Sequence, residues 1–401
     1  MTSATSAVVT GAARVDETIR RLGGHGDDFH MSWMADDRQV FAVCDGCGWA
    51  DRPTRRFNSR LHVVTGGPDD AYFEDVPSYP ELVDDFDDMR GRSRYYGFAT
   101  IAFDGGIYQY LSTPNVPFRE RGPRFVGAKL IYSPDDGATW RNQDGSTPVI
   151  WEPWEERSKD NMFFFYEPQD AFSILSVLQM GRNYEANEDG YLYFYAPNGN
   201  TETTMNQLVT CRVRRDAILD RRAYEYFAGS RSDGGAEWSK DIYDRVPIFT
   251  YPEGWVNKTT HPWSWVPSVA YNEPLGAYMM VNCGTGVAPD GHWFGMPSYL
   301  GFYISPNPWG PWTQIHEETA WTPGGDEGAR CYSPIISPKW IADDGKSFWL
   351  IWSDFQMIDD DEDRVKTEQA RSSDPAEFFR IMKKGQPYYS FNTQRVDLLF
   401  D

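Results

Sequence analysis

Two aspartates near the start of the chain stand where a pair of carboxylates could act together. Asp28 follows the glycine-rich run Gly23–Gly26, and Asp45 ends the apolar stretch Val40–Val43. Two antiparallel strands joined by a turn at Asp36–Asp37 would place the start of the first strand beside the end of the second. Both carboxylates would then share one rim of a sheet, which suits acid and base catalysis on a glycosidic bond.

The same two aspartates have a simpler interpretation, because aspartate beside glycine is ordinary turn chemistry. In a catalytic pair, burial or a neighbour must keep one carboxyl protonated near neutral pH while the other stays ionised. Asp45 ends an apolar strand, so we assign it as the acid and Asp28 as the base or nucleophile.

Other catalytic and cofactor-binding patterns are missing from the sequence. It contains no G-x-S-x-G element, no P-loop and no dinucleotide fingerprint. The 6 histidines show no H-x-x-x-H spacing, and Cys44–Cys47 is the one C-x-x-C pair among 5 cysteines. We therefore expect no catalytic metal and no cofactor, and leave open a structural cation at the centre of the fold.

The chain is long, aromatic and acidic. Of its 401 residues, 16% are aromatic, and the net charge is −21. That charge would repel a polyphosphate, which excludes nucleic acid as a partner. Most of these aromatic residues must fill the core, and a minority could line a carbohydrate-binding cleft. The oligomeric state is left open.

Neither a secretory leader nor an apolar segment of membrane-spanning length is visible in the sequence. We therefore expect no membrane partner. Action outside the cell, or on released cell-wall glycan, would need either another export route, as for a phage-borne or lysis-released protein, or a leader that the given sequence does not include.

The positioning elements are expected to be strands, because helical periodicity is confined to Val15–Leu22, a turn near Arg215–Leu219 and Asp374–Lys383. Elsewhere short apolar runs are cut by Gly, Pro, Asn and Asp, and they fall into five groups. This pattern predicts an all-β fold, a single five-bladed β-propeller over residues 24–401. Residues 1–23 would be partly flexible or packed outside it. Two β-sandwiches would need a Pro/Gly/Ser-rich joint, and none is visible.

One turn motif also favours a propeller. Ser133–Trp140 fits the Asp-box pattern S-x-D-x-G-x-T-W, which forms turns at blade edges, usually far from an active centre. In a propeller the innermost strands all begin around one end of the central channel, so residues near their starts converge. The candidate substrate-binding residues there are Asp27, Asn58, Asp170, Asn183, His261, Trp263, Trp265 and Tyr332.

Stretches along nearly the whole chain resemble one bacterial family. The most specific is Asp220–Gly229, and the others are Gly26–Phe29, Cys44–Gly46, Asn58–Leu61, Pro267–Asn272, Pro308–Trp312 and Arg395–Leu398. Through these stretches the chain resembles a five-bladed β-propeller family formerly classed as a domain of unknown function. The characterised members of that family are endo-D-arabinanases, glycoside hydrolase family 183.

The resemblance implies a hydrolase of a furanose polysaccharide, with mycobacterial-type arabinan (arabinogalactan or lipoarabinomannan) as the expected substrate in cell-wall degradation. The paired acids of the family lie in the first blade and correspond to Asp28 and Asp45. Asp27 replaces a small hydroxyl residue, which leaves open whether Asp27 or Asp28 faces the cleft. Cys44 and Gly46 also depart from the family pattern, which leaves the glycan open. The alternatives are a non-catalytic carbohydrate-binding propeller of a phage or cell surface, another furanosidase, or a polysaccharide lyase.

Overall fold

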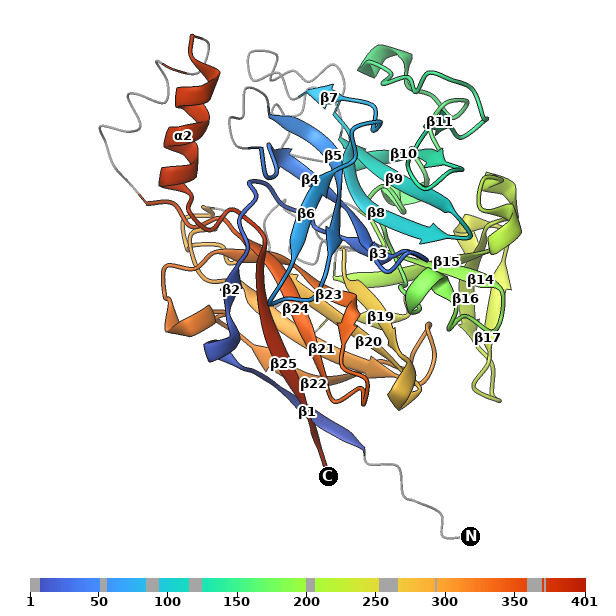
Figure 1. The fold of residues 1–401 in the computed structure, drawn as a ribbon. Coiled ribbons are helices and arrows are strands. Elements are labelled where there is room, and N and C mark those ends of the chain that lie inside the picture. Colours follow the sequence, from blue (N-terminus) through green and yellow to red (C-terminus); the bar gives the residue numbers. More distant parts are fainter. Residues whose placement is uncertain are drawn as a thin grey trace.

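The computed structural model describes residues 8–50, 56–83, 94–114, 125–199, 206–251, 266–292, 294–358, 370 and 373–401. Five antiparallel sheets form the blades of a β-propeller (Figure 1), which confirms the predicted fold class. The innermost strands β3, β8, β13, β19 and β23 contact one another in a closed ring. Among the described residues, no helix is both long and apolar enough to cross a membrane.

The blades follow one another along the chain, each beginning with its innermost strand. Blade one contains β3 (Met31–Trp33), β4 (Gln39–Gly46), β5 (Phe57–Thr65) and β6 (Tyr72–Asp75), with β7 (Leu82–Val83) paired to β5. Blade two contains β8 (Tyr96–Phe103), β9 (Gly106–Pro114), β10 (Phe125–Ser133) and β11 (Arg141–Asn142), with β12 (Phe164–Phe165) paired to β10.

The third and fourth blades continue this order. Blade three contains β13 (Ser176–Val177), β14 (Tyr191–Pro197), β15 (Gln207–Arg214), β16 (Glu225–Ser230) and β17 (Ala236–Ser239), with β18 (Phe249–Thr250) paired to β15. Blade four contains β19 (Ser268–Asn272), β20 (Ala277–Gly284), β21 (Tyr299–Ser305) and β22 (Thr313–Glu318). The Asp-box lies between β10 and β11, where Asp135 accepts hydrogen bonds from Thr139.

Blade five joins the two ends of the chain. It contains β23 (Cys331–Ile341), β24 (Ser347–Asp354) and β25 (Asn392–Phe400), followed by the N-terminal strand β1 (Val9–Arg14) as its outer strand. β2 (Arg20–Arg21) also pairs with β25, and the helix expected over residues 15–22 is reduced to a 3-10 turn at Asp16–Thr18. Part of the segment expected to lie outside the propeller therefore closes the ring.

The closure is reinforced by Arg14, whose side chain links β1 to blade four. Its Nε and Nη2 donate to the two carboxylate oxygens of Glu318 at 2.6 and 2.8 Å, and the two side chains are 10% and 18% exposed. We expect Arg14→Ala to lower the free energy of unfolding by about 2 kcal/mol, because it leaves Glu318 partly buried without its paired charge. Denaturant titration measures this. Arg214→Ala, which removes a side chain that is 60% exposed, is the control, and equal effects of the two variants would contradict the prediction.

The strand pattern follows from burial on both faces near the axis. β8 is buried along its whole length, as expected for an inner strand packed between two neighbouring blades. The predicted C-terminal helix is present as α2 (Pro375–Gly385), and its first turn is capped by Asp374, whose side chain accepts from the Glu377 N–H. α2 stands at one rim of the propeller (Figure 1).

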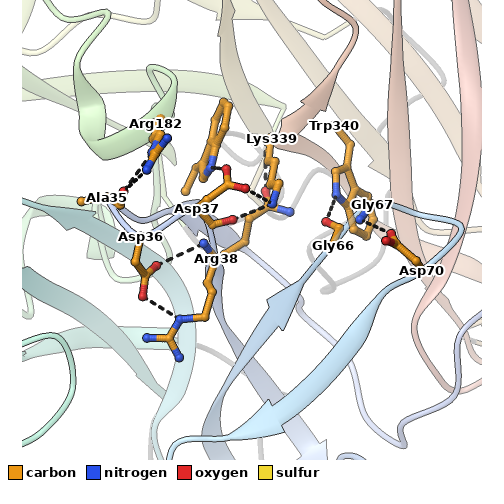
Figure 2. Close-up of polar contacts among 12 residues, drawn as sticks. Ala35, Asp36, Asp37, Arg38, Gly66, Gly67, Asp70, Arg182, Lys339 and Trp340 are labelled. Atoms are coloured by element: carbon orange, nitrogen blue, oxygen red, sulfur yellow. Dashed lines mark hydrogen bonds and ion pairs between the residues drawn. The ribbon is translucent and has the colours of Figure 1, made fainter.

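The rim where the inner strands end is held together by polar contacts between blades (Figure 2). Lys339 donates to the Asp37 carboxylate at 2.9 Å and to the Asp37 carbonyl at 2.6 Å, and Arg182 donates to the Ala35 carbonyl at 2.9 Å. These bonds anchor the β3–β4 turn from two other blades. The register of β3 and β4 is thereby fixed at the end remote from the paired aspartates.

Candidate active site

The pairing of β3 with β4 brings the aspartates of blade one to a single rim. Met31 pairs with Phe41 within these antiparallel strands, and an isolated bridge joins Asp27 to Cys44 beyond the end of β3. Asp28 therefore lies at the start of the first strand and Asp45 at the end of the second. This is the geometry that the strand–turn–strand pattern predicts.

Two glycines allow the chain to approach β4 closely at this point. A Cβ at Gly46 would lie 1.8 Å from the carbonyl oxygen of His25, and a Cβ at Gly26 would lie 2.5 Å from Val43 Cγ1. Asp28 and Asp45 both have positive φ, at 59° and 50°. Aspartate and asparagine tolerate this left-handed conformation better than most residues, so residue type and backbone agree here.

Asp27 and Asp28 form a buried carboxyl pair, with 6% and 2% of each residue exposed. One oxygen of Asp27, Oδ2, accepts hydrogen bonds from Tyr332 at 2.5 Å and from Tyr389 at 2.8 Å. Asp28 accepts a hydrogen bond from the Ser333 hydroxyl. All three donors belong to blade five, so the pair is held between the first and last blades.

Burial sets the protonation of this pair. Loss of solvent, followed by the charge of Asp45, raises the pKa of Asp27 to about 7 against the tyrosine hydrogen bonds. Burial and the charge of Asp27 raise the pKa of Asp28 well above its usual range. A hydrogen bond between the two carboxyl groups lowers the pKa of Asp27 and raises that of Asp28. Both carboxyl groups are thus biased toward their protonated forms, and the contact between them favours the proton on Asp28.

Asp45 has a more polar environment. Its side chain is 23% exposed and lies 3.3 Å from the Arg56 guanidinium, which compensates a carboxylate charge. Asn58 is fully buried, and its side-chain amide bonds two partners. Its Nδ2 donates to Asp45 Oδ1 at 3.4 Å, and its Oδ1 accepts from the Tyr95 N–H. Asn58 therefore fixes the position of Asp45. One rim thus carries a buried carboxyl pair with raised pKa values and a third, partly exposed carboxyl group paired with Arg56.

The cluster has the ligand atoms of a metal site, since oxygens of Asp27 and Asp28 and the Cys44 sulfur all lie within 4.8 Å of one another. With no ion bound, burial and the neighbouring aspartates raise the pKa of the Cys44 thiol well above its usual range. Burial favours a shared proton between Asp27 and Asp28, and it does so against their hydroxyl donors, which lower both pKa values.

The central channel is nearly filled. A cavity of about 10 Å³ remains among inner-strand residues, including His30, Thr100, Gln179 and Ser268. His30 Nε2 and Thr100 Oγ1 are buried and have no hydrogen-bond partner within the described part of the chain. This volume is about that of one water or one small ion.

Of the remaining candidates, the structure describes Asp170 and Asn183. Asp170 is buried at the strand-start rim of blade three, where its N–H bonds the Glu167 carbonyl. Asn183 lies at the opposite rim, where its side chain accepts from the Asp104 N–H at 2.9 Å. It lies there because the chain crosses the propeller along the short strand β13 before it reaches Asn183. His261, Trp263 and Trp265 lie outside the described residues.

Three partners of the carboxylates were missed by sequence reasoning: Ser333, Tyr389 and Arg56. Tyr389 and Ser333 are more than 300 residues from the aspartates that they contact, at separations of 362 and 305 positions. Ser333 is adjacent to the predicted Tyr332, and its position at the start of the fifth inner strand was the signal available. Nothing local marks Tyr389.

The raised pKa of Asp27 predicts a pH-dependent cost in stability. Its carboxyl ionises near 3.8 when free and near 7 in the fold, so the folded state binds the extra proton and stability falls as pH rises between about 4 and 7. We expect Asp27→Asn to be more stable than wild type at about pH 8, by about 1 kcal/mol or more, and to flatten this slope. Thermal unfolding at several pH values measures it, with the exposed Asp343→Asn as control. An unchanged slope would contradict it.

No protein-family model and no curated protein matches the chain. Solved structures resemble it in fold. One is a Bacteroides ovatus ATCC 8483 protein, 13% identical over 94% of this chain and 87% of that chain, with a TM-score of 0.48. Another is a thermostable family-43 glycoside hydrolase, 14% identical over 83% of this chain and 85% of that chain, with a TM-score of 0.44.

The catalytic domain of the Coprinopsis cinerea GH62 alpha-L-arabinofuranosidase is also similar. It is 10% identical over 98% of each chain, with a TM-score of 0.43. These likenesses concern the arrangement of the chain. The chemistry of the site rests on the residues of this protein.

Proposed function

We propose that this protein is a glycoside hydrolase that cleaves a furanose polysaccharide, with endo-acting hydrolysis of D-arabinan as its reaction. The observation that carries the proposal is the pair of unlike carboxyl environments on one rim: Asp28 is buried beside Asp27, which raises its pKa, and Asp45 is partly exposed beside Arg56. Hydrolysis of a glycosidic bond needs one carboxyl of each kind.

The two environments favour a division of roles opposite to the one assigned from the sequence. Asp45 was assigned as the acid because it ends an apolar strand, yet its side chain reaches past that strand to solvent and to Arg56. We propose Asp28 as the acid that protonates the leaving oxygen, and Asp45 as the carboxylate that activates water or attacks the anomeric carbon. Asp27 acts through Asp28, as the acceptor that holds its proton in place.

The substrate class is supported by charge and by sequence resemblance. A net charge of −21 disfavours anionic polysaccharides, which are the usual substrates of lyases, and is compatible with a neutral glycan. The family-183 resemblance points to D-arabinan among neutral furanose polymers. Hydrolysis of a neutral arabinan is therefore the activity to test first.

Product analysis on a panel of polysaccharides tests the proposal. The panel contains mycobacterial arabinogalactan, lipoarabinomannan, a galactofuranan and a fructan, each incubated with the purified protein. We expect oligosaccharides with saturated ends from the two arabinan-containing glycans. Products with unsaturated ends would identify a lyase. Binding without fragments from any glycan would identify a carbohydrate-binding propeller, and either result would overturn the proposal.

A further inference from the structure

A cavity of about 400 Å³ opens beside the carboxylates, on the same rim of the propeller. It lies where β23 begins and β24 ends, and its lining includes His292, Phe294, Arg330, Phe355, Gln356 and Met357. Cys331 and Asp354 pair directly below it, so two adjacent strands of blade five fix its floor. Its volume is within the range of small-ligand sites.

Aromatic rings connect this cavity to the carboxyl pair. Phe294 lies 5.1 Å from the Tyr332 ring, and Phe355 lies 5.8 Å from the Tyr389 ring, between ring centroids. These are the two tyrosines that donate to Asp27. Tyr332 and Tyr389 therefore lie between the cavity and the carboxyl pair and contact both.

The lining combines apolar faces with fixed polar groups. Phe294 and Phe355 stack on each other at 5.0 Å, and both remain partly exposed, while Met357 is 61% exposed. Such rings offer flat apolar faces of the kind on which the C–H faces of sugars stack, and a few polar groups fix orientation.

Arg330 is held in place across this cavity. Its guanidinium donates to the carbonyls of Phe294 at 2.7 Å, Ala329 at 2.7 Å and Glu327 at 3.0 Å, and its N–H donates to Asp354 at 2.7 Å. Within the described ranges, its Nη2 group has no hydrogen-bond partner. The side chain is thus immobilised by carbonyl groups and keeps donors for a ligand hydroxyl.

We infer that this cavity is a sugar-binding subsite, which holds a furanose unit of the polysaccharide next to the units bound at Asp28 and Asp45. The inference rests on the proposed hydrolase function and adds a place where the polysaccharide is bound. A sugar ring stacks on Phe294 and Phe355, and Arg330 donates to its hydroxyl groups. Such a subsite contributes binding energy only when the glycan is long enough to reach it, so it selects for polymers over short oligosaccharides.

The test compares affinity and rate along a series of α-linked D-arabinofuranose oligosaccharides of increasing length. Binding is measured by calorimetry in the Asp45→Asn background, and kcat/KM in the active protein. Phe355→Leu keeps an apolar side chain against Tyr389 but loses the flat ring, and Arg330→Gln removes the guanidinium. The exposed Tyr72→Ala, in outer strand β6, is the control.

We expect both site variants to lose about tenfold in affinity and in kcat/KM for long oligosaccharides, with a much smaller loss for short ones, while Tyr72→Ala matches wild type. If both variants keep the wild-type dependence of affinity and rate on oligosaccharide length, the subsite proposal is wrong. The hydrolase proposal would still stand. Failure of the hydrolase proposal has a different signature, because wild type itself would then release no fragments. If Phe355→Leu unfolds, Arg330→Gln decides the outcome.

Discussion

Asp45→Asn and Asp28→Asn are each expected to lower kcat by about a hundredfold or more, with the fold unchanged. An amide keeps the shape of the carboxyl group but can neither protonate the leaving oxygen nor act as base or nucleophile. Both positions have positive φ, which asparagine accepts, so circular dichroism and thermal unfolding should still report a folded propeller. Initial rates on the polysaccharide that wild type cleaves measure the effect.

The same variants separate the two roles. A substrate with an aryloxide leaving group needs little protonation, so Asp28→Asn should recover activity on an aryl arabino-oligosaccharide while Asp45→Asn stays inactive. The reverse recovery would restore Asp45 as the acid. If Asp28→Asn keeps normal turnover and Asp27→Asn does not, Asp27 takes the catalytic role. Normal turnover in both Asp28→Asn and Asp45→Asn would show that neither Asp28 nor Asp45 takes part in the reaction.

Gly46→Ala is expected to damage both the fold and the site. Its added Cβ would lie 1.8 Å from the His25 carbonyl oxygen and 2.5 Å from Gly26 Cα, and these are backbone atoms that cannot rotate away. We expect a loss of about 3 kcal/mol in the free energy of unfolding. The loop that carries Asp27 and Asp28 must also move, and a displacement of about 1 Å costs about a hundredfold in rate.

The matched control for this substitution is Gly67→Ala. Gly67 lies in the turn between β5 and β6, its backbone is not left-handed, and the nearest atom to an added Cβ is a carboxylate oxygen of Asp70 at 3.4 Å. Denaturant titration and the rate on the best substrate are compared for both variants. Equal stability of Gly46→Ala and Gly67→Ala would mean that the contact between the His25 loop and β4 does not hold the site.

The placement of Asp28 and Asp45 on one rim could be predicted from sequence because it depends on local information. Alternating strands, a short turn and flanking glycines determine which residues of one hairpin lie opposite each other. The blade count was predictable for a similar reason, since each group of strands is contiguous in the chain. The place of the N-terminal strand β1 in blade five was not predictable, because its partner β25 lies at the other end of the sequence. The six residues of β1 also show little alternation of apolar and polar side chains.

Roles within the site were less predictable than positions. The apolar residues before Asp45 suggested a buried acid, but burial of a side chain depends on what covers it from other blades. Tyr332, Ser333 and Tyr389 cover Asp27 and Asp28, whereas Asp45 points toward Arg56. Asn183 was placed on the wrong rim because the length of β13, only Ser176–Val177, could not be read from its neighbours.

The closure of blade five by the first strand has a consequence for the timing of activity during synthesis. Asp27 and Asp28 leave the ribosome more than 300 residues before their hydroxyl donors, at separations of 305 and 362 positions. A nascent chain cannot assemble the carboxyl pair before Tyr389 and β25 have emerged. Products truncated before β25 should therefore lack both a complete blade five and the proposed site.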